Sequence, residues 1–434
     1  LPNSKMSGNP NMNPQTLPVF PDLDIFSPEY ACNREKYAAR ALRDYPLHFY
    51  KPLNLWIVSK HKDVRSALFT PQVFSSVAFG LLPPPDDIAP RVPDLYTDVH
   101  LPSMDPPEHT KLRVPVQQAL LPGRLVGKDE VVRRIANELI DTFIDKGECD
   151  LLHDFSYKLA LYLIVDLLGI PKERAEDYHR WSNCFFQLFT PKVPERADAR
   201  FFVPMPEEVL RQNWEDLAEA NDYLREVVEN LDRNPGNNML SNLLQLREPD
   251  GSRTITISAN VCNALEFGAA GHDTTATLIA HLTYFVLTTP DLKDTLTEDP
   301  SLIPAAISET LRRRCPVDGL FRRTLSDVEL CGQKIESGSI VYLDLTAANL
   351  DPDVFPEPET FRLNRDNIKE MVSFGFGRHV CAGQYLSRIE AKAAYEELMR
   401  RIPNMRLADG FKLEYMPSVA TTVLKGLPLV WDKN

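Results

Sequence analysis

The segment FGFGRHVCAG, which runs from Phe374 to Gly383, decides how this sequence is interpreted. Two glycines precede a single cysteine, Cys381, and this predicts a tight turn whose backbone conformation disfavours a Cβ atom. A helix is predicted from just after the cysteine to about Arg401, and the unpaired N–H groups at its start favour an anionic sulfur. Such a sulfur is suited to be a nucleophile, a redox thiol or a metal ligand. The alternative is a buried cysteine beside a glycine turn.

The length and composition of the chain limit the classes of protein to which it can belong. With 434 residues, of which 43% are hydrophobic and 25% are charged, the chain has the composition of a globular protein with a large core. A net charge of -13 argues against nucleic acid as the main partner, because binding to phosphates requires a basic surface. No apolar stretch approaches the roughly 18 residues of a membrane span, so we expect none in this chain. Whether a leader or anchor was removed before Leu1 is left open.

The seven cysteines are scattered and include no CxxC pair. Their odd number and their spacing argue against a disulfide framework or a structural zinc site. Reduced thiols are typical of the cytoplasm, so we expect a soluble cytoplasmic protein. Six of the cysteines are expected to be small buried hydrophobic residues, and only Cys381 has unusual neighbours.

The hydrophobic pattern predicts a mainly helical fold with a minor strand component. No linker separates domains, so residues 17–434 are predicted to form a single domain after a flexible arm, residues 1–16. Helices are predicted at residues 131–168, 256–288 and 303–314. Strand fragments are predicted at residues 55–58, 73–77, 328–330 and 340–345.

Two Pro-rich segments interrupt this pattern. Residues 351–358 contain too many helix and strand breakers for regular structure. Residues 191–206 are interpreted either as a mobile cover over a pocket or as a surface connection.

The cysteine segment matches Phe-x-x-Gly-x-His/Arg-x-Cys-x-Gly at every fixed position and so resembles the haem-ligand signature of the cytochrome P-450 superfamily. With three further matches in the family's order, the resemblance covers about residues 100 to 390. It implies a mainly α fold with small β-sheets, in which haem b lies between a long distal helix and the cysteine loop. Cys381 would then be the axial ligand of the haem iron, and its thiolate would push electron density onto the metal. The resemblance also places His379 on a haem propionate, Phe374 beside the ligand loop and Gly383 where the following helix approaches closely.

The second match is AGHDTT, which begins at Ala270 within the long predicted helix. A mid-helix Thr can bond the carbonyl four residues back, so this motif alone would more often be a helix irregularity or a surface feature. In the family, Asp273 and Thr274 form an acid–alcohol pair that delivers protons for oxygen activation. Ala270 and Gly271 would leave room for a diatomic ligand, and His272 is expected to be structural or solvent-facing.

The third match is ETLR, from Glu309 to Arg312, whose two charges share one helix face. Alone, such a pair is common on protein surfaces and contributes little. The resemblance implies that it is buried, clamps the Pro-rich segment behind the haem and has a structural role. In that segment the chain has Leu350 where the family commonly has Arg, which removes a polar contact.

The fourth match is DPPEHTKLR, in which Asp105 is predicted to cap a helix. His109 and Arg113 are four residues apart and therefore share one helix face. The resemblance implies that both contact the haem propionates together with Arg322, and Arg323 is the alternative to Arg322. Several cations are expected there, because the two propionates are anionic and partly buried.

The family's layout also implies where substrate lies. The predicted walls of the pocket are mostly apolar, which indicates a small apolar organic substrate. They are Glu266, Ala269, Ala270, Val317, Leu320 and residues 78–101 and 419–421. Glu266 is one helical turn before Ala270 and is hypothesised to meet a polar or cationic group of the substrate. The alternative is a carboxylate satisfied by a protein donor or turned to solvent.

The implied function is a monooxygenase that inserts one oxygen atom from O2 into its substrate. The chain has no flavin or iron–sulfur motif, so a separate ferredoxin or reductase would supply electrons. Basic residues on the thiolate side are expected to dock this acidic partner: Lys111, Arg113, Arg378 and Arg388. The alternatives are a peroxygenase driven by H2O2 and a haem sensor without turnover. The Asp273–Thr274 pair argues against both.

Overall fold

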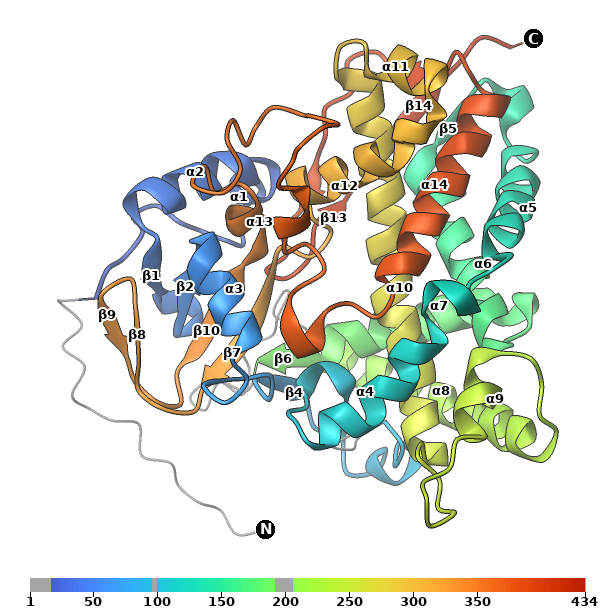
Figure 1. Ribbon diagram of the computed structural model, residues 1–434. Coiled ribbons are helices and arrows are strands. Elements are labelled where there is room, and N and C mark those ends of the chain that lie inside the picture. The colour runs from blue at the N-terminus through green and yellow to red at the C-terminus, as the bar shows by residue number, and fades with distance from the viewer. Residues whose placement is uncertain (1–16, 96–99, 192–205, 434) are drawn as a thin grey trace.

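The computed structural model describes residues 17–95, 100–191 and 206–433. Helices dominate these residues, as predicted, and the strands form small sheets (Figure 1). The helices are α1 (Pro28–Cys32), α2 (Arg34–Asp44), α3 (His61–Phe69), α4 (Glu108–Ala119), α5 (Lys128–Ile140), α6 (Tyr157–Leu168), α7 (Ala175–Leu188), α8 (Glu207–Arg233), α9 (Met239–Leu244), α10 (Ile257–Thr288), α11 (Leu292–Glu298), α12 (Ile303–Arg313), α13 (Leu345–Asn349) and α14 (Gln384–Arg401).

The strands are short and connect distant parts of the chain. They are β1 (Leu47–Tyr50), β2 (Leu55–Val58), β3 (Phe74–Ser75), β4 (Phe79–Leu81), β5 (Glu148–Asp150), β6 (Phe189–Pro191), β7 (Gly319–Thr324), β8 (Val328–Leu330), β9 (Gln333–Ile335), β10 (Ile340–Asp344), β11 (Arg406–Leu407), β12 (Tyr415–Met416), β13 (Val423–Leu424) and β14 (Pro428–Val430). The largest sheet has the order β1-β2-β10-β7-β3. In it β10 runs parallel to β2 and antiparallel to β7, with Val341 opposite Arg322.

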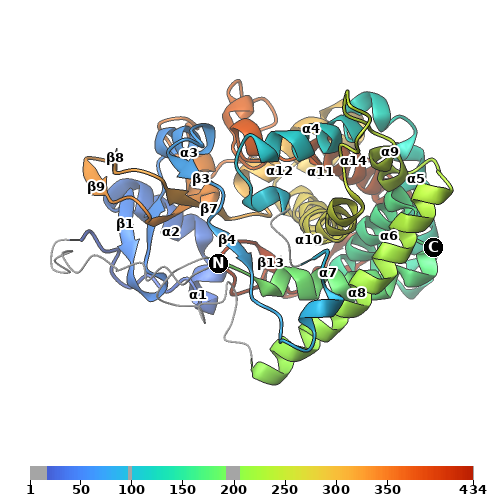
Figure 2. The ribbon, with the colours of Figure 1, turned by 90° about the horizontal axis from the view of Figure 1, so that it is seen from below.

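Helix α10 is the central element of the fold. Its N-cap is Thr256, whose side chain accepts a hydrogen bond from the N–H of Ala259, and it ends before Thr289-Pro290. Figure 2 looks nearly along α10 and shows it between the β-sheet region and helices α5, α6 and α8. The predicted helix at residues 256–288 is therefore confirmed to within one residue.

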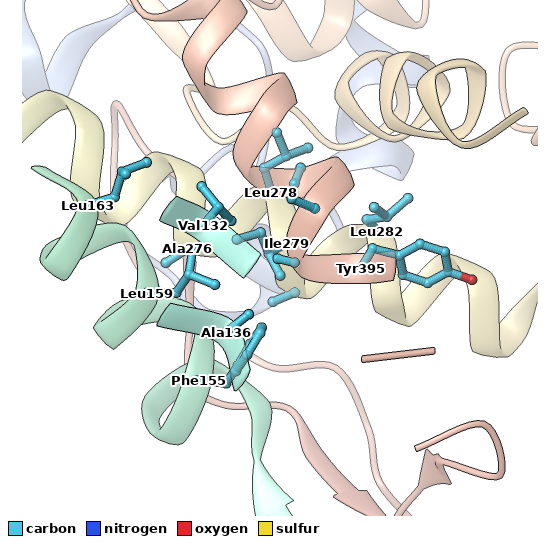
Figure 3. Close-up of a cluster of buried hydrophobic side chains, with 14 of the residues drawn as sticks. Val132, Ala136, Phe155, Leu159, Leu163, Ala276, Leu278, Ile279, Leu282 and Tyr395 are labelled. Carbon is cyan, nitrogen blue, oxygen red and sulfur yellow. The ribbon is translucent and has the colours of Figure 1, made fainter. Parts of the chain in front are cut away.

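The main hydrophobic core lies where α10 packs against α6, α12 and α14, and where α5 packs against α6 and α14. In Figure 3, Ala136 of α5, Leu159 of α6 and Ile279 of α10 lie close together, and Tyr395 of α14 lies beside them with its ring directed away. All four side chains are almost completely buried. Burying a side chain as large as Leu or Ile stabilises the fold by about 1.5–3 kcal/mol, which holds α10 and α14 in a fixed relation.

Three predictions about local structure were wrong. The predicted helix at residues 131–168 is interrupted, because Gly147 adopts a positive φ of 78° and β5 then pairs with β14 near the C-terminus. Asp105 caps no helix, since its carboxylate instead accepts hydrogen bonds from the hydroxyl of Ser75 and the N–H of Ser76. Of the six cysteines predicted to be buried, Cys331 is exposed and Cys32 is only partly buried.

Residues 1–16 and most of the Pro-rich segment 191–206 lie outside the described residues, so the predictions for them remain predictions. The predicted single domain at residues 17–434 also remains a prediction. Of the helices in the described part of the chain, none combines the length and the apolar character needed to cross a bilayer.

Candidate active site

The turn before Cys381 is as tight as the two glycines predict. Gly375 and Gly377 have φ values of 71° and 73°, in the left-handed region that favours glycine. A Cβ atom on Gly377 would also lie 2.9 Å from the carbonyl oxygen of Leu68. The N–H of Cys381 donates to the carbonyl of Phe374 at 2.8 Å, which closes the loop just before α14 begins.

The thiol of Cys381 is accessible and lies among groups that favour its anionic form. The protein groups packed around the thiol displace water from one side and raise its pKa, and the N–H groups of Gly383 and Gln384 together with the charges of Arg113 and Arg388 oppose that rise. The start of α14 thus supplies donors to the sulfur, as the sequence predicts. This environment is suited to an anionic sulfur that binds a metal.

Four basic side chains converge beside the thiol: His109, Arg113, Arg322 and His379. The rings of His109 and His379 are stacked with centroids 3.9 Å apart. Burial, and then nearby positive charge, lower the pKa of His109 to about 4 and that of His379 to about 2. Burial lowers the pKa of Arg322 to about 10.

Several nitrogen atoms of this cluster are buried without a hydrogen-bond partner among the described residues. They are both ring nitrogens of His109, Nε of Arg113 and Nε2 of His379. The nearby carboxylate of Asp105 is bound to Ser75 and Ser76. Buried donors without an anion are costly, so the cluster fits a bound group with two negative charges, such as the propionates of haem.

Two other predicted residues line the loop. The guanidinium of Arg388 lies over the ring of Phe374, 4.5 Å from its centroid. A Cβ on Gly383 would make only ordinary contact with the sulfur of Cys381, at 3.8 Å. The predicted role of Gly383 in helix approach therefore has no steric support from this contact.

The distal motif lies in the middle of α10, which is a continuous helix through it. The hydroxyl of Thr274 donates to the carbonyl of Ala270 at 2.7 Å, which is the bond predicted from the sequence. Ala270 is exposed in a helix that is otherwise mostly buried. His272 is buried rather than solvent-facing, and its Nδ1 lies 2.9 Å from Oδ1 of Asp273.

Glu309 and Arg312 form a buried pair behind the cysteine loop. Arg312 donates through Nε and Nη2 to the two carboxylate oxygens of Glu309, at 2.9 and 2.7 Å. Arg312 also donates to the carbonyl of Asn349 at 3.0 Å and to that of Pro358 at 2.8 Å. Asn349 in turn accepts from the N–H of Val372 at 2.8 Å, so the pair is connected to the chain that enters the cysteine loop.

Arg365 completes this network and was missed from the sequence. Its Nε donates to Oε1 of Glu309 at 2.8 Å, and its other nitrogens bind the carbonyls of Pro356, Glu357 and Thr360. No short motif connects Arg365 with Glu309, so spacing gave no signal. Leu350, where the family commonly has Arg, packs instead against Ala38 and Leu42 of α2.

The predicted substrate residues lie on several elements. Glu266 is buried and its Oε1 is 2.9 Å from Nδ1 of His100, a residue that sequence reasoning did not single out. Sγ of Cys262 is 3.2 Å from the same nitrogen. Protein partners thus surround Glu266, which favours the stated alternative to a substrate contact.

Ala269, Val317 and Leu320, among the other predicted wall residues, are less buried than Glu266. Ala269 is partly buried beside the α7–α8 core, and Leu320 lies close to Gly375 of the cysteine loop. Val317 forms an isolated β-bridge with Thr421, which brings two of the predicted wall segments together. Residues 96–99 of the predicted loop lie outside the described part of the chain.

Comparison with known proteins agrees with this geometry. The family model for cytochrome P450 matches residues 92–402. Cytochrome P450 107B1 of Saccharopolyspora erythraea is 33% identical over 405 residues, 91% of this chain and 93% of the relative. Vitamin D(3) 25-hydroxylase of Pseudonocardia autotrophica is 31% identical over 406 residues, 93% of each chain. The crystal structure of CYP109E1 from Bacillus megaterium with testosterone has a TM-score of 0.78 and 27% identity, and the match covers 92% of this chain and 99% of that one.

The chain therefore belongs to the cytochrome P450 family, whose members bind haem b. It is a haem-thiolate monooxygenase that acts on a small organic substrate. The expected fold, class of enzyme and cofactor are confirmed.

Proposed function

We propose that Cys381 ligates the haem iron and that His109, Arg113, Arg322 and His379 hold the haem propionates. The observation that carries this proposal is the set of buried nitrogen atoms of His109, Arg113 and His379 that lack a hydrogen-bond partner among the described residues, close to the exposed residue Cys381. Haem bound in this way supplies the redox chemistry that activates O2, and thiolate ligation favours O–O cleavage. The Glu309–Arg312–Arg365 network keeps the loop in place, since its hydrogen bonds reach the chain on both sides of the segment behind the haem.

Asp273 and Thr274 are proposed to be the catalytic residues, with Ala270 as the opening beside them. Thr274 holds its hydroxyl at the carbonyl of Ala270, at the point where α10 is exposed. The hydroxyl can accept a proton from one side and donate one to the other, and Asp273 is the adjacent acid. The chemistry consumes protons at this point, so an acid–alcohol pair is what the reaction needs.

The substrate is proposed to be apolar and similar in size to a sterol or a fatty acid. The predicted walls Ala269, Ala270, Val317 and Leu320 are apolar. Relatives and neighbours include a vitamin D(3) 25-hydroxylase, a protein solved with testosterone and one solved with an acyl carrier protein that carries hexadec-9Z-enoic acid. Titrating the haem absorption band with vitamin D3, testosterone and palmitoleic acid tests this class. Absence of any shift with all three would contradict it.

The variant Glu266→Gln distinguishes two possible roles of Glu266 in the pocket. If its charge contacts a substrate cation, Glu266→Gln weakens binding of cationic ligands far more than that of neutral ones. If Glu266 holds His100 against α10, as its 2.9 Å contact suggests, the variant weakens both alike. Equal affinity of wild type and variant for charged and neutral ligands would remove Glu266 from the pocket altogether.

A separate electron donor is proposed to dock where Lys111 and Arg378 line one surface recess. Both side chains are exposed, whereas Arg113 bonds the carbonyl of Val380 and Arg388 covers Phe374. An acidic ferredoxin would be attracted to the two exposed cations. We expect reduction to slow as ionic strength rises, and a rate independent of salt would contradict this site.

The seven cysteines form no disulfide, which supports the cytoplasm as the location.

The decisive test of function is product formation with a surrogate ferredoxin and reductase under O2. The monooxygenase produces oxidised substrate under these conditions. Product with H2O2 alone would instead support the peroxygenase, and no product with either would support the sensor.

A further inference from the structure

Two histidines lie directly behind the acid of the acid–alcohol pair. Nδ1 of His272 is 2.9 Å from Oδ1 of Asp273 and 3.3 Å from Nδ1 of His179 on α7. On the other side of His179, Nδ2 of Asn183 donates to Nε2 at 3.1 Å. Polar atoms therefore form a continuous path from α7 to Asp273.

This path leads from the interior to the surface. His272 is 2% exposed, whereas His179 and Asn183 are both partly exposed. Glu176, one helical turn before His179, is fully on the surface and its charge acts on His179. Water can therefore exchange protons with the outer histidine, while the inner histidine is shielded.

Close packing of α7 on α10 brings the two rings together. A Cβ atom on Gly268 would clash with Tyr178 and Ser182 of α7, so only glycine permits this approach. The hydroxyl of Tyr178 donates to the carbonyl of Ala264 and fixes the two helices. Tyr157 of α6 covers both imidazoles, with its ring centroid 5.1 Å from that of His272 and 6.4 Å from that of His179.

The charges around Asp273 favour its ionised form, so it needs a proton donor before it can act as an acid. Burial raises the pKa of Asp273, but the hydrogen bond and charge of His272 outweigh this and lower it. Asp273 is therefore ionised near neutral pH. Burial and the charge of His272 lower the pKa of His179 below its usual 6.5, against the opposing charges of Asp273 and Glu176. The outer histidine thus exchanges its proton readily with water.

We propose that His179 and His272 form a relay that resupplies Asp273 with protons, an inference that rests on the proposed role of Asp273. Protonated His272 gives its Nδ1 proton to the carboxylate of Asp273 and stays neutral with a proton on Nε2. His179 takes a proton from water at Nε2 once the side-chain amide of Asn183 has turned its oxygen toward that nitrogen, and then passes its own Nδ1 proton to Nδ1 of His272. His179 is left neutral and regains its first tautomer by exchange with water. One proton enters and one reaches Asp273.

The test uses the haem-loaded enzyme with a surrogate ferredoxin, its reductase and testosterone as the probe. The measured quantities are the rate of NADPH oxidation, its solvent isotope effect and its pH profile. His179→Phe should lower the rate roughly 10-fold, less than the ~10²-fold or more typical of a general acid–base group itself. It should also raise the solvent isotope effect and remove an ionisation below pH 6.5 from the profile. His179→Gln, which keeps a polar contact to Asn183 but cannot relay protons, should behave alike and guards against misfolding.

His153→Gln is the matched control. The ring of His153 also packs on Tyr157, at 5.4 Å, but its Nε2 faces the carbonyl of Lys425 rather than Asp273. This variant should match the wild type. A wild-type rate and isotope effect in both His179 variants, with a slowed Asp273→Asn enzyme, would overturn the relay and leave the proposed function intact. An unaffected Asp273→Asn enzyme would overturn both.

A second readout does not depend on turnover. Nitrogen-15 NMR of labelled histidines in the diamagnetic carbon monoxide complex follows the titration of His179. The variant His272→Asn lacks the imidazole whose charge lowers the pKa of His179, so that pKa should rise toward 6.5. An unchanged titration would show that the two imidazoles do not interact, and the relay would be abandoned.

Discussion

The two sides of the active site are held together by different kinds of contact. Behind Cys381, the framework of Glu309, Arg312 and Arg365 is almost wholly buried, and its partners lie within 60 residues of one another. On the distal side, Asp94 is buried but bonds Arg225 of α8, whose side chain is 38% exposed, and Ser258 of α10. The proximal framework is therefore a compact unit that positions the ligand loop. The distal cover, by which we mean the segment of residues 89–95 that contains Asp94, depends on a few long-range contacts. We expect this segment to unfold locally more easily than the proximal framework.

The largest expected effect comes from breaking the proximal framework. Glu309→Gln removes the charge that faces two buried guanidinium groups, and uncompensated buried charge is strongly destabilising. We expect the free energy of unfolding to fall by about 3–5 kcal/mol, measured by urea denaturation. In the matched surface variant Glu138→Gln, whose partners Arg134 and Lys172 are exposed, the loss should be under about 1 kcal/mol. Equal losses in the two variants would contradict the comparison.

A smaller and more local effect is expected on the distal side. Asp94→Asn weakens the hydrogen bonds to Arg225 and Ser258, at a cost of about 1–3 kcal/mol. Hydrogen exchange at residues 89–95 should become faster while the exchange of α14 stays unchanged. The control is Asp222→Asn, whose carboxylate pairs with exposed Arg91 and should have almost no effect. Faster exchange throughout the protein would show that the cover and the framework unfold together.

The smallest effect concerns a proximal acid that lacks the partners of Glu309. Glu390 of α14 is buried, and its Oε2 has no hydrogen-bond partner among the described residues. Burial raises the pKa of Glu390 well above its usual 4.5, so its neutral form is favoured in the folded protein. The wild type then loses stability as pH rises through that raised pKa, because the unfolded chain ionises first.

Glu390→Gln removes this loss. The variant should gain at least about 1 kcal/mol of stability relative to wild type at pH 8, and the gain should be smaller at pH 5. Thermal unfolding at the two pH values measures the difference. Parallel pH dependence of wild type and variant would mean that Glu390 has a partner that stabilises its charge.

The same comparison explains what the sequence predicted. Helix α10, the turn at Gly375 and Gly377 and the bond from Thr274 to Ala270 were predicted correctly, because each depends on residues close together in the chain. The family resemblance added the cluster of basic residues His109, Arg113, Arg322 and His379. The contacts that were missed connect residues far apart, such as His100 with Glu266 or β5 with β14. Asp105 has a side chain suited to an N-cap, but the hydroxyl of Ser75 and the N–H of Ser76 bind its carboxylate instead.

The central claim is that the sulfur of Cys381 is bonded to haem iron, and the absorption spectrum of the freshly reduced carbon monoxide complex tests it most directly. The claim predicts a red-shifted band typical of thiolate ligation in the wild type and its loss in Cys381→Ser. A spectrum typical of histidine ligation in the wild type, or colourless protein after haem supplementation, would contradict it.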